Sequence, residues 1–69
     1  MKAYKIFDTN KGADGFGRWI TEYTEADTPL KAVEKYYTNV VREYDACRSK
    51  GHIVVYGERA SYVYSGAIK

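Results

Sequence analysis

The sequence has little of what usually stabilises a very small domain. Its 69 residues include one cysteine, one histidine and one proline. A single cysteine excludes a disulfide within the molecule, and Cys47 with His52 falls short of the four ligands that a structural zinc site needs. Domains of this size are marginally stable without such additions. We therefore expect a well-packed aromatic core, self-association, or both.

Long apolar runs are also absent. No stretch of about 18 apolar residues occurs, which excludes a membrane-spanning helix at the level of sequence. The basic start at Lys2 is not followed by the apolar segment of a signal peptide, and one free thiol suits a reducing compartment, so the expected location is the cytoplasm. The formal net charge of +2 arises from basic and acidic residues that alternate along the chain, which permits contact with nucleic acid without predicting it.

What the sequence does contain is tyrosine, eight in all, and alternating apolar positions. The alternation predicts a strand over Lys2–Asp8, with Tyr4 and Ile6 on one face and Ala3, Lys5 and Phe7 on the other. A second strand is predicted over Arg18–Ala26, with Trp19, Thr21 and Tyr23 sharing one face. The glycine-rich segment between them is too flexible to continue a strand, so the two should form a hairpin closed by a long loop.

A helix is predicted next, and its start is the clearest local signal. Thr28 is suited to be the N-cap, with Pro29 at the first helical position, where its missing N–H is no loss. Apolar residues then recur at steps of three and four, which predicts one buried stripe, and Gly51 is the expected stop. The stripe consists of Leu30, Val33, Tyr37, Val40, Val41 and Tyr44. The stretch 38–41 is a poor helix former, so a break there is the open alternative.

Two further strands complete the predicted fold. Ile53–Tyr56 is dense in β-branched residues, residues 61–65 form another strand, and residues 57–60 join them tightly. The predicted fold class is α+β, a single domain over residues 1–69 with the order ββαββ. Its sheet has four strands, mostly antiparallel, and one helix packed on one face.

The last two strands point to a contact surface. One helix covers only one face of a sheet, and an antiparallel sheet with a wet face should alternate apolar and polar residues. Here Ile53 and Val55 oppose Val54 and Tyr56, and Tyr62 and Tyr64 oppose Val63, so both faces are apolar. Exposed apolar patches usually mark interaction sites, although a small domain also exposes tyrosines whose hydroxyls tolerate water.

The glycine-rich loop is a second candidate contact. Phe16 lies between Gly15 and Gly17, next to Arg18 and Trp19, where an aromatic side chain serves either as a recognition tip or as a plug for the end of the sheet. The candidate partner-binding residues are Phe16, Arg18, Trp19, Arg59, Tyr62 and Tyr64. Their partner is a protein, with the chain itself as one option in a homodimer.

Catalytic and metal sites are not predicted. Cys47 is expected near a helix C-terminus, which raises a thiol pKa, and no third group orients His52 as a base. The segment from Asp8 begins like a calcium loop, but Gly12 and Trp19 stand where oxygen ligands belong. The loop glycines lead into a strand rather than a helix, which argues against a phosphate site. No catalytic residue, cofactor or metal is therefore expected, and the chain is interpreted as a non-enzymatic binding module.

Single-stranded nucleic acid is the alternative ligand. Sheet aromatics stack on bases in several RNA-binding and single-strand-binding proteins, and Trp19, Tyr62 and Tyr64 are suited to this role, with Arg18, Arg59 and Lys5 near the phosphates. The balanced charge predicts weak counterion release, which disfavours this alternative.

Residues 25–33 resemble the strand-to-helix connection of many small sheet-plus-helix proteins, including phage accessory proteins and some antitoxins. The resemblance covers a short stretch and consists mostly of N-cap chemistry. It implies a stand-alone partner-binding protein, such as an inhibitor carried by a mobile element.

Overall fold

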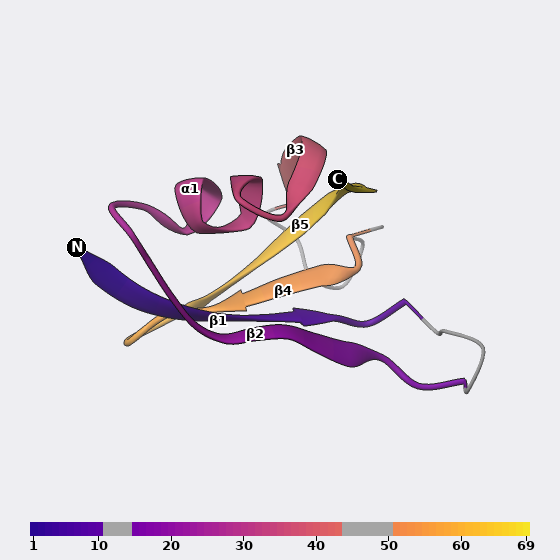
Figure 1. Cartoon of the computed structure of the whole chain (residues 1–69), viewed down its shortest axis with the longest axis horizontal. Coiled ribbons are helices and arrows are strands. Elements are labelled where there is room, and N and C mark those ends of the chain that lie inside the picture. Colours follow the sequence, from indigo (N-terminus) through magenta and orange to yellow (C-terminus); the bar gives the residue numbers. More distant parts are fainter. Residues whose placement is uncertain (11–14, 44–50) are drawn as a thin grey trace.

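The computed structural model describes residues 1–10, 15–43 and 51–69, which form an α+β fold with a five-stranded sheet and one short helix (Figure 1). The elements are β1 (Lys2–Asp8), β2 (Arg18–Ala26), α1 (Pro29–Glu34), β3 (Tyr37–Glu43), β4 (Ile53–Tyr56) and β5 (Ser61–Ile68). The strand order is β2-β1-β4-β5-β3, and every neighbouring pair is antiparallel. Within the described ranges, no helix has the length and apolar character needed to span a membrane.

The predicted long helix is wrong beyond its first turns. Its start is confirmed, because the Thr28 side chain accepts a hydrogen bond from the Lys31 N–H and Pro29 opens the helix. The helix ends at Glu34, however, and the chain continues as β3, which pairs with β5 along the outer edge of the sheet. Residues 38–41 are rich in β-branched side chains, which fit a pleated strand better than a helix. The predicted order ββαββ therefore becomes ββαβββ.

A bulge shapes the new strand. The pairing of β3 with β5 shifts between Thr38 and Val41, and Asn39 has a φ of 55°, in the left-handed region where Asn is among the favoured residues. A Cβ added to Gly66 would lie 2.9 Å from the Thr38 carbonyl oxygen, so the bulge requires glycine on the opposite strand. The bulge thus lets β3, which the sequence predicted to be helical, pair with β5.

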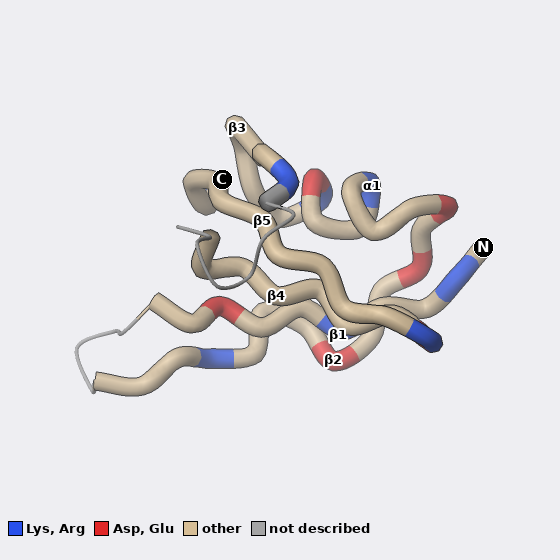
Figure 2. The backbone as a smooth tube through the Cα atoms, turned by 180° about the vertical axis from the view of Figure 1, so that it is seen from behind, with Lys and Arg blue, Asp and Glu red and all other residues tan. Residues whose placement is uncertain are grey.

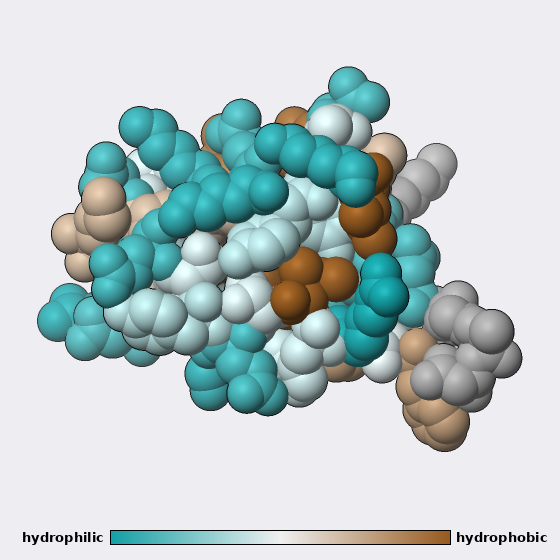
Figure 3. Space-filling model, in the orientation of Figure 1, coloured by the Kyte–Doolittle hydropathy of each residue, from teal (hydrophilic) through white to brown (hydrophobic). Residues whose placement is uncertain are grey.

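The core lies between the sheet and α1 (Figure 1). Ala32 and Val33 of the helix pack on the buried residues of the sheet. The largest fully buried side chains are Tyr37, Tyr64, Ile6, Ile53, Val33 and Val55. Each of the aliphatic side chains among them contributes about 1.5–3 kcal/mol by leaving water. On the face seen in Figure 3, hydrophilic side chains cover most of the surface and hydrophobic ones gather in small patches.

One polar contact crosses this core. The Tyr37 hydroxyl donates a hydrogen bond of 3.1 Å to Oδ2 of the buried Asp8, which joins β3 to β1 across the core. The other carboxylate oxygen of Asp8 accepts the Asn10 N–H at 2.9 Å. Burial raises the pKa of the Tyr37 phenol above its usual value of 10.0, the charge and hydrogen bond of Asp8 raise it further, and Arg18 partly opposes them. The neutral phenol is therefore strongly favoured in the folded protein.

Tyr37→Phe is expected to lower the free energy of unfolding at neutral pH by about 1–3 kcal/mol, because it leaves a buried carboxylate oxygen without its donor. A phenol whose folded pKa is raised contributes stability that is complete below pH 10 and is lost as the pH rises further. The difference in stability between wild type and variant should therefore shrink above pH 10. Urea unfolding followed by circular dichroism at neutral pH and above pH 10 measures this, and a difference that grows with pH contradicts the assignment.

The edge strand β2 also carries bulges. Its register against β1 shifts between Tyr4 and Ile6 and again between Ile6 and Phe7. The Thr21 hydroxyl donates to the Tyr23 carbonyl at 2.9 Å and accepts the Tyr23 N–H at 3.2 Å, so a side chain occupies backbone groups of the edge. The shifts interrupt the predicted alternation: Trp19 lies opposite Phe7, Thr21 lies opposite the buried Ile6, and Ile20 packs against the core.

Candidate functional site

The side of the sheet opposite α1, here called the open face, carries three aromatic rings in contact. Strand pairing puts Phe7 opposite both Trp19 and Val54, and Lys5 opposite Tyr56, so these side chains share one face. The Phe7 and Trp19 ring centroids are 5.0 Å apart in an edge-on arrangement, and those of Trp19 and Tyr56 are 5.8 Å apart. Phe7, Trp19 and Tyr56 are called the aromatic cluster below.

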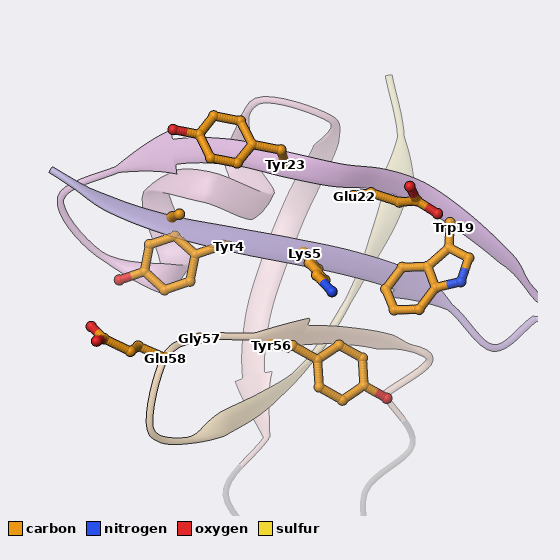
Figure 4. Close-up of a pocket in the computed structure, with 9 residues that line it drawn as sticks. Tyr4, Lys5, Trp19, Glu22, Tyr23, Tyr56, Gly57 and Glu58 are labelled. Atoms are coloured by element: carbon orange, nitrogen blue, oxygen red, sulfur yellow. The ribbon is translucent and has the colours of Figure 1, made fainter.

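A hollow of about 560 Å³ lies beside the aromatic cluster. Its walls come from β1, β2, β4 and the β4–β5 turn (Figure 4). The lining residues are Ala3, Tyr4, Lys5, Trp19, Glu22, Tyr23, Tyr56, Gly57 and Glu58. Trp19 is 47% exposed, Tyr23 64% and Tyr56 42%. A largely apolar hollow with a few polar groups is the usual character of a binding site in this size range.

Charged groups surround the aromatic rings of the hollow. Lys5 projects from β1 beside Tyr56, and Glu22 and Glu58 lie at opposite ends of the hollow in the close-up (Figure 4). Figure 2 shows the basic position of β1 next to an acidic position of β2. The Tyr23 hydroxyl donates a short hydrogen bond to the Glu25 carboxylate, which raises the pKa of the phenol. The hollow therefore offers aromatic surface with carboxylates at its rim.

Comparison with known proteins gave no match. No model of a protein family fits the chain, and neither the curated proteins nor the solved structures contain a significantly similar one.

Of the six predicted contact residues, Trp19 belongs to the hollow. Phe16 is 74% exposed and precedes β2, next to Gly15, whose φ of 82° suits glycine. Phe16 is not among the residues that line the hollow. Of the predicted loop and sheet contacts, Trp19 lines the hollow, and Phe16 is exposed just before β2.

The two predicted arginines do not line the hollow beside the aromatic cluster. Arg18 pairs with the buried Asp8 and faces the α1 side, where it lines a second hollow of about 420 Å³ with Lys35 and Lys69. Arg59 lies in the β4–β5 turn and lines a third hollow, of about 430 Å³. Neither arginine lines the hollow beside the aromatic cluster, but Arg18 shares the second hollow with Trp19, and Arg59 shares the third with Glu58.

Tyr62 and Tyr64, which were predicted as contact residues, lie on the side of the sheet that α1 covers. Tyr64 pairs with Ile53 and is 1% exposed in the core, and Tyr62 pairs with the buried Val55 and packs against the core at its edge. The guanidinium carbon of Arg42 lies 5.1 Å from the centre of the Tyr62 ring. Tyr62 and Tyr64 occupy the helix side because their cross-strand partners do.

Sequence reasoning omitted most of the hollow. It placed Lys5 and Phe7 on one face of β1, and Val54 and Tyr56 on one face of β4, and both groupings are confirmed by the pairing of the two strands. These strands are far apart in the sequence, so alternation alone did not reveal that the two groups meet. Combining the two alternating patterns on adjacent strands would have assembled the aromatic cluster.

The Cys47 prediction lies outside the described residues, as does Gly12 of the calcium-loop comparison. His52 is half-buried, and its carbonyl accepts the Thr9 N–H at 2.7 Å and the Thr9 hydroxyl at 3.0 Å. Within the described ranges, no group of three or more His, Cys, Asp or Glu side chains is placed to hold a metal ion.

Proposed function

We propose that this chain is a protein-binding module that takes a segment of a partner protein on its open face, at the hollow beside the aromatic cluster. The observation that carries the proposal is the exposure of Trp19 and Tyr56 in direct ring contact on the side that α1 does not cover. Tryptophan and tyrosine are the residue types that most often dominate binding energy at protein interfaces. An apolar patch that stays exposed in a small folded domain usually marks a surface that a partner covers.

Binding through the face is favoured over pairing at an edge of the sheet. Both edge strands, β2 and β3, have register shifts, and Thr21 occupies backbone groups of Tyr23 at the β2 edge. Bulges and occupied backbone groups hinder the addition of another strand. A partner would therefore contact side chains of the open face, with the exposed Phe16 as a further apolar contact beside the start of β2.

The carboxylates on the walls of the hollow disfavour two other partners, nucleic acid and a second copy of the chain. Nucleic acid would bring phosphates toward Glu22 and Glu58 on the walls of the hollow, at the cost of like-charge repulsion. A homodimer formed by two open faces would bring two hollows of the same net charge together. A different protein avoids both contacts.

The proposal is tested by replacing Tyr23 at the rim of the hollow with the photoreactive residue p-benzoylphenylalanine, in cells that make the protein. Irradiation is expected to attach a partner protein at this position, and Trp19→Ser should reduce that product strongly because it removes the centre of the aromatic cluster. The matched control carries the photoreactive residue at Leu30, which is 40% exposed on α1. The control should give little of the same product.

Three outcomes contradict the proposal. A nuclease-sensitive product at position 23 would favour nucleic acid, a product of twice the chain mass would favour a homodimer, and equal products at positions 23 and 30 would show that the open face is not selective.

A further inference from the structure

The open face differs in charge from the chain as a whole. Glu22 and Glu58 line the hollow, and Glu25 is hydrogen-bonded to the Tyr23 phenol on its wall, whereas Lys5 is the one basic residue among the lining residues. The full sequence, by contrast, has 11 basic and nine acidic side chains. The lining of the hollow therefore carries two carboxylates and one ammonium on a protein that is weakly basic, and Glu58 also lines the third hollow with Lys2 and Arg59.

Aromatic rings and carboxylates together favour a cation. The face of a tryptophan or tyrosine ring attracts an ammonium or guanidinium group, and a nearby carboxylate adds a charge-assisted hydrogen bond. Trp19 and Tyr56 offer such rings 5.8 Å apart and tilted by 49°, with Glu22 beside Trp19 and Glu58 beyond Tyr56 (Figure 4). A guanidinium suits this arrangement best, because it stacks on rings and binds carboxylates in a planar fork.

We propose that the hollow recognises a basic side chain, arginine or lysine, on the partner segment, and that Lys5 holds the same place in the free protein. This inference rests on the proposed function, since it names the chemistry of the segment that the open face takes. Lys5 lies opposite Tyr56 on the sheet and projects toward the hollow (Figure 4). Its ammonium balances part of the rim charge until a partner cation takes that role.

The direction in which the affinity changes when the Lys5 charge is removed therefore distinguishes the classes of ligand. If the partner is basic, removing the Lys5 charge removes a competitor and strengthens binding. If the partner is acidic, or is a nucleic acid, the same change removes an attraction and weakens binding. Removing the Glu22 and Glu58 charges has the opposite effect in each case.

The test begins with selection from a library of random peptides displayed on phage, using the whole chain as the immobilised target. Peptides that also bind the Trp19→Ser, Tyr56→Ser double variant are discarded. The retained peptides are expected to be rich in arginine and lysine. One of them is then synthesised and titrated, with the fluorescence of Trp19 as the signal, because Trp19 is the single tryptophan in the chain and lies in the hollow.

The charge variants are exposed, near-isosteric changes that preserve the aromatic cluster. We expect Glu22→Gln with Glu58→Gln to weaken the synthetic peptide about tenfold and Lys5→Gln to strengthen it about threefold, as for exposed charge contacts next to rings. The matched controls Glu34→Gln and Lys31→Gln lie on α1 and should leave the affinity unchanged. Binding should weaken as salt is raised.

The remaining outcomes separate the two proposals. Selected peptides that are neutral or acidic, or a Lys5→Gln variant that binds more weakly, overturn the basic-ligand inference while the protein-binding function stands. Failure to retain any peptide that distinguishes wild type from the double variant overturns both. A mixed single-stranded oligonucleotide that quenches Trp19 more strongly than any peptide also overturns both.

Discussion

Tyr64→Ser is expected to lower the free energy of unfolding by about 3–5 kcal/mol, the usual cost of truncating a large buried aromatic side chain. Tyr64 is 1% exposed, it pairs with Ile53 across the β4–β5 ladder, and it is among the largest side chains of the core. Domains of this length have about 3–10 kcal/mol of stability in total. Much of the variant should therefore be unfolded at room temperature, as measured by urea denaturation and circular dichroism.

Tyr56→Ser is the matched control for this prediction. Tyr56 has the same side chain but lies on the open face and is 42% exposed. Its replacement should cost about 1 kcal/mol or less, since it loses partial burial and one ring contact. Equal losses of stability in the two variants would contradict the assignment of the two sides of the sheet.

Gly17→Ala is expected to lower the free energy of unfolding by about 1–3 kcal/mol, because an added methyl group has no room. A Cβ at this position would lie 2.5 Å from the Asp8 carbonyl oxygen and 2.9 Å from a ring carbon of Phe7. Relieving the overlap must move the Phe7 ring, which is in contact with Trp19. The variant should therefore change both the stability and the near-ultraviolet circular dichroism of Trp19.

Gly15 provides the comparison for Gly17. Nothing lies within 4 Å of a Cβ added there, but its φ of 82° disfavours most side chains. Asn tolerates a positive φ better than most residues. Gly15→Asn should therefore lower the free energy of unfolding less than Gly17→Ala and leave the near-ultraviolet circular dichroism of Trp19 unchanged. A Gly17→Ala variant that retains wild-type stability and spectrum would contradict the close approach.

Local sequence signals predicted several elements correctly. The bounds of β1, β2 and β4 agree with the predicted strands, and β5 begins at the predicted Ser61 but continues to Ile68. The start of α1 is confirmed by the hydrogen bond to Thr28. Strand alternation and helix capping depend on residues near one another in the chain, which is why they are readable from sequence.

The end of the helix depends on a distant strand. Val33 and Tyr37 are both buried, as the helical stripe predicts, but Val33 reaches the core from α1 and Tyr37 from β3. Apolar residues four apart are compatible with a helix and with a short helix followed by a strand. Pairing with β5 decides between them, and that partner lies beyond Gly51 in the sequence.

The candidate site was partly predictable for a similar reason. An apolar helix-free face was expected, and Trp19 lies on it, but Tyr64, also predicted as a contact residue, lies in the core. Alternation tells which residues of one strand share a face, not which of the two faces a helix covers. The bulges of β2 add a further change of face that only the pairing with β1 reveals.

The bulged edges also bear on how recognition by this protein can change over time. A sheet that binds through its edge reads the backbone of its ligand, so its selectivity is tied to the strand pairing that also maintains its fold. On the open face, Glu22, Tyr56 and Glu58 are exposed and lie outside the buried core. Under the proposed function, substitutions at these positions would redirect the protein to new ligands while the packed side of the same strands stays unaltered.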